Sequence, residues 1–123
     1  MSAFVHPYVP DPNSLEPLPP PYEILELEPG KPVRIKVLGY KIGRMTIHPK
    51  YSAGAFEKTI VAIRIFTDEE SKPTFPQYWD ITPSRLVYQL APLLANHNMI
   101  GRTIELYRDI PGPKAHYQVR IVE

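Results

Sequence analysis

The sequence predicts an all-β domain with one helix, a small five-stranded barrel that follows a disordered, proline-rich arm. Eight of the 16 prolines lie before residue 30. Beyond Glu23 the apolar residues mostly alternate with polar ones, as in half-buried strands, and one segment after Thr82 has apolar residues at helical spacing. We therefore place the arm at residues 1–22 and the barrel domain at 23–123, in the order β-β-β-α-β-β.

The arm, residues 1–22, is expected to be flexible because proline lacks an amide donor and fixes φ, which excludes a regular ladder or a helix interior. Residues 1–30 contain five acidic and no basic side chains, a charge of −5. Residues 31–123 carry all 14 Lys and Arg against eight acids, a charge of +6. A basic domain tethered to an acidic arm suits a polyanionic partner, and the arm can compete with that partner for the basic domain. Alternatively, both charges only keep the protein in solution.

The five strands are expected at residues 32–43, 56–66, 75–81, 103–108 and 115–122. In the first, Gly39 and Gly43 mark the bends that allow one strand to serve two sides of a barrel. The last two strands, separated by Pro111-Gly112-Pro113, form a closing hairpin.

The helix is predicted to begin at Thr82-Pro83, where Thr82 caps the free amides and Pro83 takes the first helical position. One apolar stripe follows at spacings of three and four, formed by Leu86, Leu90, Leu93 and Leu94.

This order, with a long glycine-bent first strand and a helix after the third, resembles the OB-fold of single-stranded nucleic-acid-binding proteins over residues 31–122. The run Trp79-Asp80-Ile81-Thr82-Pro83-Ser84-Arg85-Leu86 looks like the strand-to-helix junction of small OB-type proteins of phage, mobile-element or archaeal type. The chain departs from the bacterial pattern because its acidic segment is N-terminal. The resemblance implies a five-stranded OB-type barrel whose ligand face combines strands two and three with loops 44–55 and 110–114.

We therefore expect non-catalytic binding of single-stranded DNA with little sequence preference. Such binding needs cations that follow the phosphates and flat rings on which bases stack. These segments supply both in Arg44, Lys50, Tyr51, Phe56, Lys58, Arg64, Phe66, Tyr78, Trp79 and Lys114.

Pleat parity sends Tyr78 and Trp79 to opposite faces of their strand. We place Trp79 inward with Ile81, which leaves Tyr78 facing the ligand. In the reverse register Trp79 would stack on the bases, and Asp80 would point into the core, where burying its charge costs much free energy. Phe56 and Phe66 have an alternative role as caps of the barrel ends.

Catalysis, metals and cofactors are not expected. The chain has no cysteine, and its four histidines, at positions 6, 48, 97 and 116, lack metal-ligand spacing. It also has no Gly-rich phosphate loop and no serine elbow.

Two alternatives to DNA binding stay open. One is a protein-interaction module of a replication or transcription assembly, with the arm or a sheet edge engaging the partner; the other is RNA binding.

Without an apolar run of about 18 residues, we expect a cytoplasmic protein with no membrane contact. Open sheet edges would permit an oligomer, but no residue calls for one.

Overall fold

The computed structural model describes residues 12–48, 57–112 and 114–122. The elements in chain order are the 3-10 turn η1 (Pro12–Ser14), β1 (Val33–Lys36), β2 (Gly39–Ile47), β3 (Lys58–Phe66), β4 (Tyr78–Ile81), α1 (Ser84–Asn96), β5 (Thr103–Arg108) and β6 (Tyr117–Ile121).

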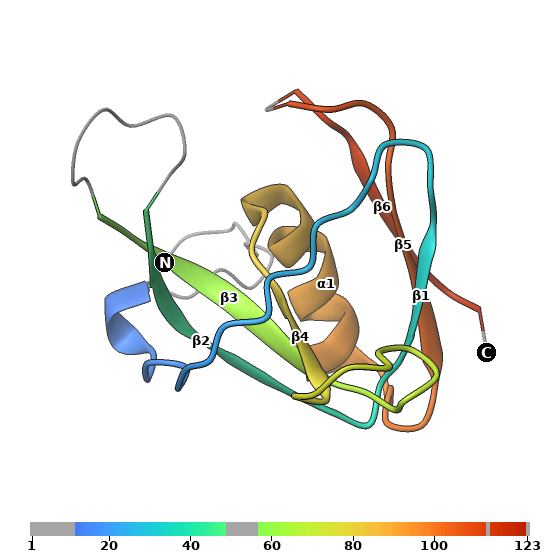
Figure 1. The fold of residues 1–123 in the computed structure, drawn as a ribbon, viewed down its shortest axis with the longest axis horizontal. Coiled ribbons are helices and arrows are strands. Elements are labelled where there is room, and N and C mark those ends of the chain that lie inside the picture. The colour runs from blue at the N-terminus through green and yellow to red at the C-terminus, as the bar shows by residue number, and fades with distance from the viewer. Residues whose placement is uncertain (1–11, 49–56, 113, 123) are drawn as a thin grey trace, which may run out of the picture.

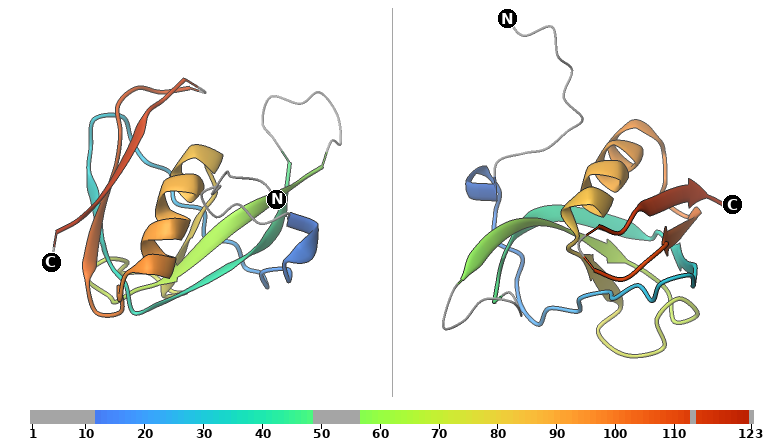
Figure 2. Two further views of the ribbon diagram at one scale, coloured as in Figure 1. Left: turned by 180° about the vertical axis from the view of Figure 1, so that it is seen from behind. Right: turned by 90° about the horizontal axis from the view of Figure 1, so that it is seen from above.

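The strands form two three-stranded antiparallel sheets, ordered β1-β5-β6 and β2-β3-β4. Helix α1 lies between them and contacts β3 of one sheet and β6 of the other (Figures 1 and 2). The main core combines the buried face of α1 with the inner faces of both sheets, including Ile35, Ile63, Leu90 and Leu106. At 13 residues α1 is the longest helix in the described ranges, and it is shorter than the roughly 20 residues that span a bilayer.

The prediction of a five-stranded OB-type barrel is wrong, because the described chain has six strands in two sheets that do not close. The expected first strand, residues 32–43, is broken where the backbone changes partners. Val37 exchanges hydrogen bonds with Gly101 and Arg102, whereas the next residue, Leu38, donates to the carbonyl of Phe66. The two parts, β1 and β2, therefore belong to different sheets.

The start of α1 also differs from the prediction. Pro83, not Thr82, occupies the N-cap position, and no side chain caps the helix. The apolar stripe is largely as predicted, with Leu86, Leu90 and Leu94 buried, although Leu93 is only partly buried. Consequently the hydroxyl of Thr82 is not used by the helix.

The described part of the expected flexible arm, residues 12–22, is packed against the domain. Residues 15–25, called the strap below, run from the edge of β2, where Pro17 bridges Arg44, to the edge of β4, where Ile24 bridges Asp80 (Figure 1). Leu18 is only 1% exposed and packs with Met45 and Ala62 on the face of the sheet away from α1. This apolar contact holds the strap across the outer face of β2-β3-β4.

Gly43 is the residue that lets the strap approach β2. A Cβ atom at this position would lie 2.7 Å from the Cγ of Leu18 and 2.8 Å from the carbonyl oxygen of Glu16. Glycine in a strand often marks such a close approach of another backbone. The glycine that was expected to bend a barrel strand instead accommodates the N-terminal segment.

Candidate nucleic-acid interface

The structure brings only some of the candidate binding residues together. Lys50, Tyr51 and Phe56 lie outside the described residues. Arg64 and Phe66 project from β3 on the outer face of β2-β3-β4, and register pairing adds Tyr78 from β4 beside Phe66. Lys58 lies at the other end of β3, eight residues from Phe66, and is not brought to these rings. Lys114 is exposed in the loop before β6, in the other sheet.

Arg64 is committed to a buried ion pair with Asp80. Its Nε donates to Oδ1 at 2.8 Å, a second donor lies 3.2 Å from Oδ2, and the two side chains are 4% and 0% exposed. Burial disfavours the charged guanidinium, but the hydrogen bond and the charge of Asp80 outweigh it and raise the pKa of Arg64. Asp80 also accepts from the amide of Glu23 in the strap. Both charges are thus satisfied within the chain, and Arg64 is not free to contact a phosphate.

Arg44 is also occupied. Its guanidinium donates to the carbonyl of Leu15 at 3.1 Å, and its backbone forms the bridge to the strap. Two of the predicted cations, Arg44 and Arg64, therefore fasten the strap.

Tyr78 lies on the outer face and Trp79 on the inner face, as the preferred register predicted. The indole of Trp79 packs against the main core, with the ammonium of Lys72 5.0 Å from the ring. Its Nε1 is buried and has no hydrogen-bond partner in the described part of the chain. Asp80 lies on the outer face with Tyr78, but the strap covers it.

The ring of Tyr78 is held from three sides. The guanidinium carbon of Arg64 lies 4.0 Å from the ring centroid, Phe66 meets it edge to face at 5.8 Å, and the phenol donates to the carbonyl of Pro21. Phe66 remains 40% exposed. The alternative role of Phe66 as a cap of a barrel end does not apply, because the two sheets do not close into a barrel.

Two further residues extend this region. Lys41 is exposed and pairs with Arg64 across β2 and β3, which places it diagonally from Phe66. Tyr22 is 38% exposed and directly follows Pro21, whose carbonyl accepts from both Arg64 and Tyr78. We call Tyr22, Lys41, Phe66 and Tyr78 the aromatic patch. Sequence reasoning missed Tyr22, which it assigned to the arm, and Lys41, which the alternation in residues 39–47 would have placed on the same face as Gly43.

The outer face of the other sheet carries a second set of charges. Glu105 accepts from Arg34 at 3.1 Å and from Arg120 at 2.8 Å, so one carboxylate joins all three strands. Hydrogen bonds from Arg120 and Arg34 lower the pKa of Glu105. Arg34 was expected on a solvated strand face, and its side chain is 65% exposed. This arrangement links the strands of the sheet.

No family model, curated protein or solved structure matches the chain. In the described ranges no three His, Asp or Glu side chains gather as metal ligands would. The chemistry of the site therefore rests on the residues described above.

Proposed function

We propose that the aromatic patch binds single-stranded nucleic acid, without catalysis and with little sequence preference, and that single-stranded DNA is the first ligand to test. The observation that carries this proposal is the pair formed by Phe66 and Tyr78, two rings in contact on an outer sheet face with Lys41 beside them. A strand of any sequence offers base faces for such rings and phosphates for the cation.

The support of the two rings favours stacking. Because Tyr78 is held by Arg64, Phe66 and the carbonyl of Pro21, little side-chain freedom is left to lose when a base packs on it. Stacking contributes about 1–3 kcal/mol per base. The charge of +6 over residues 31–123 adds a long-range attraction for phosphates.

The test is fluorescence anisotropy of labelled oligothymidine, its duplex and oligouridine at two salt concentrations. We expect the single strand to bind more tightly than the duplex and binding to weaken as salt rises. Phe66→Ala should weaken binding about 5- to 150-fold. Ile110→Ala, which truncates an exposed apolar side chain outside the patch, is the matched control and should have no effect.

Two outcomes would overturn the proposal. Equal affinity of the folded Phe66→Ala variant and wild type would remove the patch as the binding face. No binding of any strand at low salt would remove the function itself. Tighter binding of oligouridine than of oligothymidine would assign the patch to RNA.

A protein-interaction module is the second candidate, favoured by one observation. Phe75 is 88% exposed at the end of the loop between β3 and β4, and Leu38 and Ile100 are also exposed. The affinity of an apolar protein interface would change little with salt, whereas the affinity for phosphates falls steeply as salt rises. The titration at two salt concentrations therefore separates the two candidates.

A further inference from the structure

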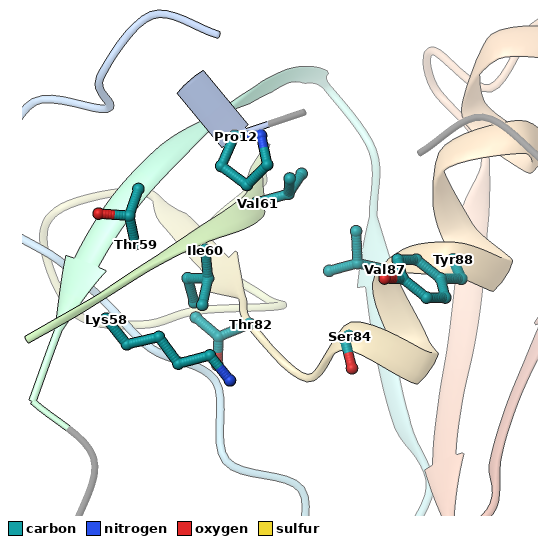
Figure 3. A pocket seen from close by; sticks show the side chains of 9 residues that line it. All are labelled: Pro12, Lys58, Thr59, Ile60, Val61, Thr82, Ser84, Val87 and Tyr88. Atoms are coloured by element: carbon teal, nitrogen blue, oxygen red, sulfur yellow. The ribbon is translucent and has the colours of Figure 1, made fainter. Parts of the chain in front are cut away.

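A pocket of about 270 Å³ opens between the first half of β3 and the first turns of α1 (Figure 3). Val61 and Val87 form apolar walls, whereas Lys58, Thr82, Ser84 and Tyr88 bring an ammonium group and three hydroxyls to it. Its volume is near the lower end for small-molecule sites, which start at roughly 300 Å³. It suits one compact group and not several successive units of a polymer.

Four polar side chains of this pocket have no partners in the described structure. Lys58, Thr82, Ser84 and Tyr88 form no side-chain hydrogen bond or ion pair there, and the helix start uses no side-chain cap. This contrasts with Arg44, whose guanidinium is bonded to a strap carbonyl. Four hydrogen-bonding groups are thus available around one hollow.

The charge and shape of the pocket indicate the chemistry of its ligand. Lys58 is the only charged residue among those described that line it, so the pocket favours an anion. The side chain of Lys58 extends toward Thr82 in Figure 3. Tyr88 keeps 44% of its surface exposed, and Val87 is buried beside it, which together offer an apolar wall to a flat ring.

We propose that this pocket binds one nucleotide, with its phosphate on Lys58 and the hydroxyls of Thr82 and Ser84, and its base against Val61, Val87 and Tyr88. The site is separate from the aromatic patch. Lys58 and Phe66 are the two ends of β3, eight residues and about 26 Å apart, and Leu18 of the strap packs on Ala62 between them. The nucleotide is either free or part of a bound strand, because both present the same phosphate and base.

The test titrates the full-length, isotopically labelled protein with thymidine 5′-monophosphate and follows backbone amide shifts by NMR. Saturable shifts at Lys58, Ser84 and Tyr88 are expected, and Lys58→Met should weaken binding about tenfold because it removes a charge-assisted contact. The matched control is Lys31→Met, which removes an exposed lysine outside both sites and should leave this affinity unchanged.

Three comparisons decide the result. Absence of shifts around the pocket, or equal affinity of wild type and Lys58→Met, would overturn the proposal. Inorganic phosphate that binds as tightly as the nucleotide would overturn the assignment of the base. Thymidine that binds as tightly as the nucleotide would overturn the assignment of the phosphate.

A parallel titration with oligothymidine separates the two sources of the nucleotide. Shifts of the pocket amides by the strand identify a nucleotide of bound DNA, and shifts confined to the aromatic patch identify a free one. If the strand fails to bind while the mononucleotide saturates the pocket, the proposed function is lost and the pocket assignment stands.

Discussion

The guanidinium of Arg64 and the carboxylate of Asp80 form an ion pair in a part of the sheet from which the strap excludes water. Their closest atoms are 2.8 Å apart, and each partner has a further contact to the strap, at the carbonyl of Pro21 for Arg64 and the amide of Glu23 for Asp80. The pair therefore connects β3, β4 and the strap. Removal of either charge would leave the other buried without compensation.

We expect Asp80→Ala to lower the free energy of unfolding by about 3–5 kcal/mol, as is usual when one partner of a buried pair is removed. Urea unfolding followed by tryptophan fluorescence would measure it. The double variant Arg64→Met, Asp80→Leu is the control, because an apolar pair of similar volume leaves no unpaired charge and should be closer to wild type. A loss below about 1 kcal/mol for Asp80→Ala would show that water reaches the site.

The sequence predicts the local elements of this fold better than their connections. Alternation placed strands over β1, β3, β4, β5 and β6, and the leucine stripe placed α1. It covered only the first five residues of β2, because residues 44–47 were expected in a loop. The change of sheet between Val37 and Leu38 depends on the distant carbonyl groups to which their two amides donate. The periodicity of apolar residues along the sequence carries no information about these partners. The barrel was inferred from the order of the elements and from two glycines interpreted as bends in the first strand, yet Gly43 allows the strap to contact β2.

The candidate site shows the same difference between local and distant information. Parity correctly separated Tyr78 from Trp79, because side-chain direction follows from the pleat. Arg64 was expected to contact a ligand because the strand pattern placed its side chain on the outer face of the sheet. The pattern does not show which other segment of the chain covers that face. The covering segment lies more than 40 residues earlier and is rich in proline, a composition that sequence reasoning reads as flexible.

Gly43→Ala tests how the strap is seated. The added methyl would meet Leu18 and the backbone oxygen of Glu16 at less than 3 Å, so the strap must shift. We expect a destabilisation of about 1–3 kcal/mol and faster proteolytic cleavage within residues 15–25. The matched control is Gly39→Ala in the same strand, where the nearest atom is 3.7 Å away in the side chain of Phe66. Equal effects of the two substitutions would contradict the close packing of the strap.

Glu105 should give the fold part of its acid sensitivity. Because Arg120 and Arg34 lower its pKa in the folded state, its carboxylate stabilises the fold above the unfolded pKa of about 4.3. This stability is lost as the pH falls through the lower, folded pKa. Urea unfolding at pH 7 and pH 3 should show a smaller loss for Glu105→Gln than for wild type. Arg120→Met should reduce the loss in the same direction, and an unchanged pH dependence in both variants would exclude this role.

Lys72 and Lys31 offer a comparison of a buried and an exposed ion pair. Lys72 is completely buried, donates to the carbonyls of Thr74 and Pro76, and lies 2.9 Å from the carboxylate of Glu23. Lys31 forms a short pair with Glu28, but both side chains are about two-thirds or more exposed, at 74% and 68%.

Lys72→Met keeps the apolar stem and removes the ammonium, so the carbonyls that it bonds lose their donor in a buried place. We expect a loss of about 1–3 kcal/mol in unfolding free energy and faster amide hydrogen exchange in the loop between β3 and β4. Lys31→Met should change neither measurement, since solvent replaces its partner and screens the pair. Similar effects of the two variants would mean that the loop is held by its backbone contacts alone, because the ammonium of Lys72 is then no more important than an exposed charge.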